Sequence, residues 1–364
     1  DKNIVTGIGI EPKYTHRAIR AAMPIDTVIV DYVYPGTPAY QQLKFDDEIE
    51  AINGQSLNGK YYTDVAELIA QNSTSVEVKV TRLDAPITVA QKEIQKPALY
   101  SRTVKFNGKT MKWVRITRFV MGVAKQFERE LKLANQANVD GLILDLRGNP
   151  GGLVDEGVAV LKMLVLKQGE VFHTEGHGRN REYANQKYEV NGKPIYTAPL
   201  IVMIDSDTAS IAEVVASSIQ STSRGLLIGN KSFGKGSVQV TQSISPVNGF
   251  GGLLITTVAL IYYPHNNSHQ VAGVIPDYIL KDDRFDQAVA ILKEKKDQII
   301  IFESDYANAI LPYDSGNPIA KNELISSKHL DENKAELDHA CDEVTYQKCL
   351  ETYATRFLDL MING

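Results

Sequence analysis

The sequence predicts a mixed α/β protein of more than one domain: a β-rich amino-terminal module, an α/β core and a helical carboxy-terminal region. Three observations predict it. Short strand-like runs fill the first 90 residues, apolar strands alternate with amphipathic helices from about residue 113, and the chain turns charged and helical from about residue 284. A chain of 364 residues is also too long for one ordinary core. We therefore expect domains at 1–90, 91–283 and 284–364.

The first module has the pattern of short strands broken by turns and one helix. Strands are expected over residues 26–34, 47–53 and 75–83. Val65, Leu68 and Ile69 fall at helical spacing, which predicts a helix over 63–72. The segment 91–101 is expected to be a linker.

The core alternates between strands and helices. Strands are expected over 113–119, 141–146, 198–205, 225–229, 237–242 and 252–263, and helices over 122–137, over 154–167 and up to about 223. The polar stretch 175–193 is expected to be an exposed hairpin or loop. The last helix carries one apolar stripe that must pack on another element: Tyr346, Leu350, Tyr353, Phe357 and Met361.

Composition excludes several classes of partner and cofactor. A net charge of -5 leaves no basic field for nucleic acid or an anionic membrane. No run approaches the roughly 18 apolar residues of a membrane helix, and the first residues lack the layout of a signal peptide, so we expect any export signal to lie outside this chain. Cys341 and Cys349 are too few for a zinc cage of cysteines, and they could be free thiols or one short disulfide.

Ser210 lies where a predicted strand meets a predicted helix. Asp205, Ser206 and Asp207 before it are natural helix-capping residues, and an apolar helical run follows it. At such a corner the helix dipole and free N–H groups favour developing negative charge, as an acyl-transfer nucleophile requires. A lone serine at a helix start is nevertheless usually only a cap.

Two glycine-rich segments add to this signal. Lys235 stands between Gly234 and Gly236, and glycine removes side-chain bulk around a lysine that must approach another group closely. A lysine acts as a base only when neutral, a form that burial favours. The segment GLILDLRGNPGG at 141–152 is a buried strand running into a turn whose N–H groups could bind an oxyanion or another anion.

Together these segments resemble the carboxy-terminal processing proteases, or tail-specific proteases, which are Ser-Lys enzymes. TASIAE at 208–213 is similar to the nucleophile motif SASASE, and SFGKGSVQ at 232–239 to the lysine motif TFGKGSVQ. Lys235 follows Ser210 by 25 residues, the spacing expected in that family. DLRGNPGG and GVIPD, at 145–152 and 273–277, resemble the family's DLRxNxGG and GxxPD.

The resemblance implies roles for individual residues. Ser210 would be the nucleophile, Lys235 its general base and Gln239 the residue that orients the lysine, while the amides of Gly151 and Ile211 would form the oxyanion hole. The family's small residue after the nucleophile is Ile211 here, and this bulk could narrow the site. The implied core is the spiral β/α, crotonase-like fold of the family, and no metal or cofactor is implied.

The resemblance extends to the first module, which looks like the PDZ domain of these proteases. TGIGI at 6–10 resembles its carboxylate-binding loop, and residues 34–55 resemble PGSPA...GLKxGDxIxxING, with Asp46 in place of a glycine. The backbone of Gly7, Ile8, Gly9 and Ile10 would bind a terminal carboxylate. Side chains of this loop and of the helix after it, namely Ile8, Ile10, Val65 and Ile69, would line an apolar pocket.

The implied function is a serine endopeptidase that cleaves proteins near unstructured, apolar carboxy-terminal tails in a periplasm or equivalent exported compartment. Protein or peptide tails are the expected partners, and the carboxy-terminal helices could bind an adaptor or a second copy of the chain. The alternative is a catalytically silent PDZ-type scaffold that binds tails without cutting them.

Two rival chemistries fit the sequence less well. GNKSFGK at 229–235 satisfies the phosphate-loop pattern GxxxxGK, but Gly236 stands where a Ser or Thr should hold magnesium, and a strand pattern follows. A Ser-His-Asp triad would need an oriented histidine, and the pairs His173/His177 and His265/His269 lie in turns, where we expect surface histidines.

Overall fold

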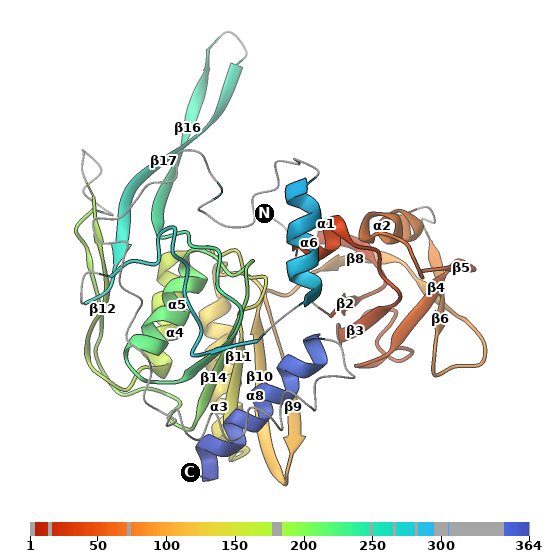
Figure 1. Ribbon diagram of the computed structural model, residues 1–364, viewed down its shortest axis with the longest axis horizontal. Coiled ribbons are helices and arrows are strands. Elements are labelled where there is room, and N and C mark those ends of the chain that lie inside the picture. The colour runs from red at the N-terminus through yellow and green to blue at the C-terminus, as the bar shows by residue number, and fades with distance from the viewer. Residues whose placement is uncertain are drawn as a thin grey trace. The chain divides into compact units, whose positions relative to one another are not determined.

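The computed structural model describes residues 4–13, 17–70, 74–176, 184–247, 250–264, 267–280, 283–294, 305 and 346–363 (Figure 1). The chain forms two compact units. The first comprises Asp1–Tyr100 and Asp282–Ile299, and the second comprises Ser101–Lys281 and Ile300–Gly364. In the described parts of the chain, no helix combines the length and the apolar character needed to cross a membrane.

The first unit is built on a β-sheet in the order β2-β3-β4-β6-β7, with β5 paired to β4. Its sheet strands are β2 (Ile10–Pro12), β3 (Val28–Val33), β4 (Glu48–Ile52), β5 (Gln55–Ser56), β6 (Ser75–Val80) and β7 (Ile87–Ala90). A separate antiparallel pair joins β1 (Ile4–Gly7) to β8 (Lys92–Gln95). The helices are α1 (Arg17–Ala22), α2 (Tyr62–Ala70) and α6 (Asp283–Glu294), of which α6 contacts α1.

Alternation of apolar and polar residues explains the strands of this unit. In β6, Val76, Val78 and Val80 are fully buried, whereas Glu77 between them is exposed. Side chains of successive strand residues point to opposite faces, so this pattern buries one face of the sheet. The three strands and the helix expected between residues 26 and 83 are confirmed.

The segment 91–101 is not the linker that we expected. Its first part is the strand β8, paired with β1, and Ile94 in it is buried. The next strand, β9 (Leu99–Phe106), begins within the same segment. The alternating pattern of KEIQ was too short to separate a paired strand from a polar connection.

Asp46, which replaces a glycine of the PDZ pattern, has a φ of 67°. Glycine adopts this left-handed conformation without strain, and aspartate is among the few other residues that tolerate it. Lys13 donates to Asp46 Oδ1 at 3.1 Å. The substitution therefore keeps the turn that the glycine of the pattern would form.

The second unit contains a six-stranded sheet in the order β18-β15-β14-β11-β10-β9. Besides β9, its strands are β10 (Lys109–Ile116), β11 (Gly141–Asp145), β14 (Leu200–Ile204), β15 (Leu226–Gly229) and β18 (Tyr278–Ile279). The pairs β10–β11, β11–β14, β14–β15 and β15–β18 are all parallel. Every residue of β11 and β14 is buried, as expected of parallel strands covered on both faces.

Helices cover the two faces of this sheet (Figure 1). On one face α3 (Val123–Gln136), α4 (Val154–Leu164) and α5 (Ile211–Ser221) pack side by side in that order. On the other face α8 (Tyr346–Asn363) contacts β11, β14 and β15. Its Tyr353 and Phe357 are fully buried with Ile143, Ile201 and Ile228 of the sheet, so this part of the predicted apolar stripe packs on the core.

A second sheet of this unit has the order β13-β12-β17-β16. Its strands are β12 (Gly169–Glu175), β13 (Lys187–Val190), β16 (Ser237–Val247) and β17 (Phe250–Tyr262). β12 pairs only with residues 260–262 of β17, and the rest of β17 pairs with β16 alone. The β16–β17 hairpin therefore extends from its unit as a two-stranded arm (Figure 1).

Some predictions fall partly or wholly outside the described residues. Of the polar stretch 175–193, residues 177–183 lie outside them, and the remainder includes β13. The pairing of Cys341 with Cys349 also lies outside them. The division at 90 and 283 remains a prediction, since α6 packs in the first unit and α8 in the second.

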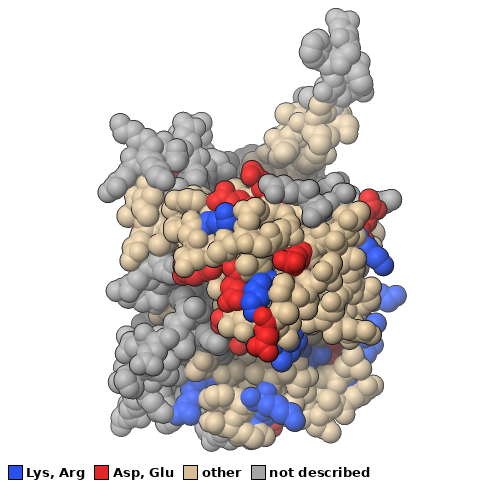
Figure 2. All heavy atoms as spheres, turned by 90° about the vertical axis from the view of Figure 1, so that its right-hand side faces the viewer, with Lys and Arg blue, Asp and Glu red and all other residues tan. Residues whose placement is uncertain are grey.

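Charges of both signs are interspersed on the face shown in Figure 2, the right-hand side of Figure 1. Ion pairs of the first unit bring such charges together, for example Arg82 with Asp47 and Lys79 with Glu50. Among the residues coloured there, no large field of one sign is formed.

Candidate active site

The three segments singled out in the sequence follow three neighbouring strands. DLRGNPGG leaves β11, the turn before Ser210 leaves β14, and the lysine turn leaves β15. Because these strands are parallel and adjacent, their carboxyl ends lie at one edge of the sheet. Backbone hydrogen bonds link the turns: Ala209 N–H donates to Asn149 O at 2.9 Å, and Phe233 N–H to Thr208 O at 3.0 Å.

Ser210 occupies the N-cap position of α5, at the corner between strand and helix that the sequence predicts. Its backbone has φ 58° and ψ −129°, whereas an N-cap residue is normally extended. Positive φ is rare for a residue other than glycine, and such strain is concentrated at functional sites. Ser210 is half-buried at the start of a helix whose next ten residues are all buried.

Glu213 connects Ser210 to the lysine turn. Its fully buried carboxylate accepts hydrogen bonds on Oε2 from the backbone N–H groups of Ser210 and Lys235, both at 2.8 Å. On Oε1 it accepts from Gly234 N–H at 2.7 Å and from the Ser232 hydroxyl. One side chain thus fixes the backbone of both predicted catalytic residues.

Our sequence analysis missed this role of Glu213. The signal was present as the capping-box pattern S-x-x-E, in which the fourth residue accepts a bond from the N-cap N–H. The pattern could not show that the same carboxylate also binds the lysine turn, which lies 19 to 22 residues further along the chain.

The lysine side chain is hydrogen-bonded to Gln239, the residue that the resemblance predicts to orient it. Lys235 Nζ donates to Gln239 Oε1 at 2.8 Å. Gln239 lies in β16 beside an irregularity in the pairing of β16 with β17, between Val238 and Gln239. Such bulges redirect side chains and are over-represented near active sites.

Gly151 lies directly against Ser210. A Cβ at Gly151 would be 2.7 Å from the Ser210 Cβ and 3.2 Å from the Ile211 N, and its φ of +95° favours glycine. The Gly151 N–H donates to Asn149 Oδ1 at 2.9 Å in this conformation. Gly151 therefore lies beside the Ile211 amide, and its own N–H has a side-chain partner.

Ile211 does not narrow the site as we expected. Its side chain is buried, and a Cβ at Gly157 of α4 would be 2.3 Å from Ile211 Cγ1. The bulk of Ile211 therefore fills the packing between α4 and α5, where Gly157 makes room for it.

Buried charges support the turn after β11. Arg147 makes two hydrogen bonds to Asp145, with Nε–Oδ1 at 2.9 Å and Nη2–Oδ2 at 2.6 Å. Burial alone would raise the pKa of Asp145, but the guanidinium groups of Arg147 and Arg115 lower it to about 2. This ionised cluster fixes the base of the glycine-rich turn.

Asp205, at the end of β14, has a raised pKa, in contrast to Asp145. Burial, and then the nearby Asp207, raises the pKa of Asp205 to about 7. Its Oδ1 accepts from the N–H groups of Gly148 and Asp207, both at 3.0 Å, so it links the first two turns.

The predicted peptide-binding residues lie together in the first unit. Ile8 and Val65 belong to its buried core, and Ile10 and Ile69 pack against that core. Gly7 and Gly9 flank Ile8, and Thr37 occupies the space that a side chain at Gly9 would need. β2, which begins at Ile10, is an edge strand of its sheet.

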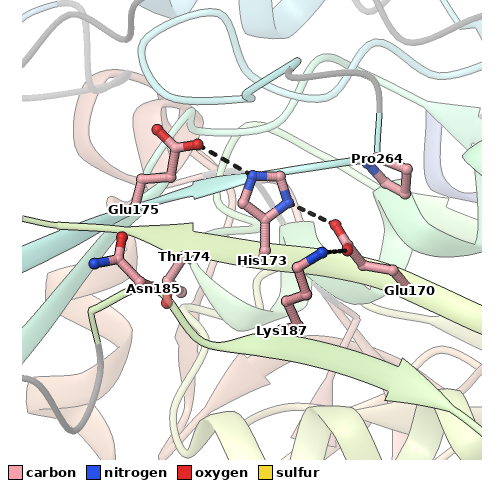
Figure 3. A pocket seen from close by; sticks show the side chains of 7 residues that line it. All are labelled: Glu170, His173, Thr174, Glu175, Asn185, Lys187 and Pro264. Atoms are coloured by element: carbon pink, nitrogen blue, oxygen red, sulfur yellow. Dashed lines mark hydrogen bonds and ion pairs between the residues drawn. The ribbon is translucent and has the colours of Figure 1, made fainter.

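His269 is not the surface histidine that we expected, because its side chain is fully buried. His173, by contrast, lies in a polar pocket of about 410 Å³ (Figure 3), with Nδ1 2.7 Å from Glu170 and Nε2 3.4 Å from Glu175. The pocket is lined by Glu170, His173, Thr174, Glu175, Asn185, Lys187 and Pro264. None of the three motifs contributes to it, and within the described residues no group of three His, Cys, Asp or Glu side chains could hold a metal ion.

Comparison with known proteins identifies both domains. Residues 111–280 match the model of peptidase family S41, and residues 29–82 match that of the PDZ domain. The carboxyl-terminal-processing protease of Picosynechococcus sp. is 26% identical over 285 residues, which cover 77% of this chain and 65% of that protein. The carboxy-terminal-processing protease of Bartonella bacilliformis is 29% identical over 285 residues, covering 76% and 61%. The chain thus spans less than two thirds of these relatives.

The fold is also that of a solved structure. A protein from Bacteroides fragilis assigned to the S41 proteases is similar with a TM-score of 0.57 and 18% identity, over 80% of this chain and 83% of that one. With both matches, the chain contains a peptidase S41 domain at residues 111–280, preceded by a PDZ domain at residues 29–82.

Proposed function

We propose that this protein is a serine endopeptidase of the carboxy-terminal processing type, with Ser210 as nucleophile and Lys235 as general base. The observation that carries the proposal is the buried carboxylate of Glu213, which binds the backbone of Ser210 and of Lys235 through one oxygen. A binding protein would need neither the strained serine nor a lysine whose amine is hydrogen-bonded to Gln239.

In the first half of the reaction the Ser210 Oγ attacks the scissile carbonyl carbon, while neutral Lys235 takes the hydroxyl proton on Nζ. The carbonyl oxygen becomes an oxyanion. When the C–N bond breaks, the protonated Lys235 gives its proton to the leaving amine, and an ester on Ser210 remains. Gln239 accepts from Nζ and so limits the positions that the amine can take.

In the second half, water attacks the ester carbon and Lys235 takes a proton from it. Breakage of the C–O bond then releases the carboxylic acid, and the proton returns from Lys235 to the Ser210 oxygen. Backbone N–H groups at the start of α5 and in the glycine-rich turn would stabilise both oxyanions. Ile211 and Gly151 are the proposed donors, and Gly151 would have to exchange or share its bond to Asn149.

We further propose that the substrates are proteins with unstructured, apolar carboxy-terminal tails, met in a periplasm or another exported compartment. The PDZ domain supports recognition of tails, since PDZ domains bind an extended peptide as an added strand. An adaptor or a second copy bound through the carboxy-terminal helices is part of the same proposal.

The test is cleavage of a tailed polypeptide by the wild type and by Ser210→Ala, Lys235→Ala and the double variant. Each single substitution should abolish cleavage, and the double variant should be no worse than either, because the two groups act as one unit. Full cleavage activity of folded Ser210→Ala would show that the chain uses other chemistry, whereas no cleavage by the wild type would favour the tail-binding scaffold. Binding of tails by Ser210→Ala would support tail recognition by the PDZ domain, but it would not support the catalytic assignment.

A further inference from the structure

The segment after β17 runs along the lysine turn. Val271 N–H donates to Gly234 O at 2.7 Å, and Gly236 N–H donates to Gln270 Oε1 at 2.6 Å. A Cβ at Gly236 would lie 2.9 Å from the Gln270 N, and one at Gly234 would lie 3.0 Å from the Val271 O. The absence of side chains at Gly234 and Gly236 therefore allows this segment to pack against the lysine turn.

His269 is the member of this segment that contacts Lys235 itself. Its Nε2 lies 3.0 Å from the Lys235 carbonyl oxygen, and its Nδ1 lies 2.8 Å from the Tyr263 hydroxyl. Both side chains are almost completely buried. Burial raises the pKa of Tyr263, so this hydroxyl keeps its proton and can donate it to His269 Nδ1.

These partners determine which ring nitrogen carries the hydrogen. A carbonyl oxygen can only accept, so Nε2 must be the donor to Lys235 O. The Tyr263 hydroxyl can donate to Nδ1, so both ring nitrogens of His269 have a hydrogen-bond partner. The Glu213 carboxylate lies 3.8 Å from Nε2, on the side where it binds the Lys235 N–H.

We infer that His269 is a positioning residue for the reaction, acting through the backbone of Lys235. Glu213 binds the N–H of the lysine and His269 binds its C=O, so both ends of that residue are fixed by fully buried side chains. A fixed backbone leaves only the side-chain torsions to place the amine, and Gln239 limits those. The inference rests on the proposed function, because it assigns the purpose of the contact to the base.

The experiment compares His269→Gln with His269→Asn by steady-state cleavage of a tailed peptide. The longer glutamine can place its amide N–H where Nε2 stands, whereas asparagine reaches only the position of Nδ1. We expect His269→Asn to lower kcat about 10- to 100-fold at nearly unchanged KM, since a misplaced catalytic group slows the chemical step. His269→Gln should recover most of that loss, and His269→Leu should resemble His269→Asn.

Matched substitutions control for general damage. His173→Asn and His173→Gln change the other described histidine of the same unit, which bonds to Glu170 and not to the lysine turn. Tyr263→Phe removes the hydroxyl that is hydrogen-bonded to His269 Nδ1, so it should lower kcat. Tyr196→Phe removes a buried hydroxyl that has no hydrogen-bond partner, so its kcat should equal that of the wild type. Thermal unfolding of every variant reports folding independently of rate.

The outcomes separate this inference from the proposed function. Equal kcat values for folded His269→Asn and His269→Gln, or an effect on KM alone, would overturn the role of His269 while Ser210→Ala and Lys235→Ala stay inactive. Activity in Ser210→Ala would overturn the proposed function itself. If His269→Leu fails to fold, the asparagine and glutamine pair still decides, because both keep a polar side chain at that position.

Discussion

At the scale of single residues, the site depends most on the four hydrogen bonds that Glu213 accepts. Glu213→Gln keeps the shape but replaces one acceptor oxygen by an NH₂ group facing buried donors. Each donor left unsatisfied costs about 1–3 kcal/mol. We expect a loss of stability of this order in urea unfolding, together with a kcat at least 100-fold lower, because Ser210 and Lys235 lose their common anchor.

Glu156→Gln is a matched control for that substitution. Glu156 also accepts from two backbone N–H groups, those of Gly122 at 2.7 Å and Ala124 at 2.8 Å, at the start of α3. Glu156→Gln should also lose stability, because a buried donor loses its acceptor, but it should retain the kcat of the wild type. If both variants lost activity in proportion to their stability, Glu213 would have no special relation to the site.

Gly151 gives a second prediction at this scale. In Gly151→Ala the new methyl group would meet Ser210 and the Ala209 carbonyl at less than 3 Å, in a backbone region that alanine avoids. We expect cleavage to fall below detection. Gly169→Ala has the same kind of positive φ with no heavy atom within 4 Å, so it isolates backbone strain from the clash. Comparable activity of both alanine variants would remove Gly151 from the oxyanion hole.

At the scale of elements, the turn between β14 and α5 should make stability depend on pH. Asp205 has a pKa of about 7 in the folded chain against 3.8 as its ordinary value, so folding favours its protonated form. The stabilisation is complete below about pH 4 and is lost as pH rises towards 7, at roughly 1.4 kcal/mol per unit of pKa shift. Asp205→Asn, which mimics the neutral acid, should weaken this dependence in urea unfolding at pH 5 and pH 8. An unchanged difference between the two pH values would contradict the assignment.

The last helix provides a test of packing. Phe357 of α8 is fully buried between Tyr278, Tyr353 and the sheet. Phe357→Ala should destabilise the second unit by about 3–5 kcal/mol, the usual cost of such a cavity. Ile362→Ala, at the half-buried edge of the same cluster, should cost less. Equal denaturant midpoints for the wild type and Phe357→Ala would mean that α8 does not support the core.

Particular elements show what the sequence could predict. The strands β11 and β14 were predicted because each is a continuous apolar run, and the helices α3 and α5 because each has one apolar stripe. In both cases the signal lies within the segment itself. Ser210 and Lys235 were predicted as site residues because short motifs match those of the family at a fixed spacing. Glu213 and His269 were not, because a buried polar side chain shows its purpose only through partners distant in the sequence. A pair of strands as short as β1 and β8 is fixed by long-range pairing, which periodicity cannot reveal.

At the scale of the whole molecule, the PDZ domain and the peptidase domain must act on one polypeptide if tails are selected before cleavage. We predict that a substrate ending in a free carboxylate is cleaved about 10-fold more efficiently than the same chain amidated at its end, whereas short blocked peptides show no such difference. The reason is that the backbone N–H groups of the loop at Gly7–Ile10 can pair with a charged carboxylate but gain little from an amide.

The helix beside that loop makes this prediction specific to the PDZ domain. Ile69→Asp places a charge in the apolar cluster that would receive the last side chain, and it should lower kcat/KM for the free-acid tail towards that of the amide. Ala66→Asp introduces the same charge at an exposed position of the same helix and should leave the preference intact. Short blocked peptides, which bypass the PDZ domain, should be cleaved equally by both variants and thereby report an undamaged dyad. If Ile69→Asp kept the full preference for the free acid, the carboxylate would have to be recognised elsewhere, and the PDZ domain would lose its role in selection while Ser210 and Lys235 kept theirs.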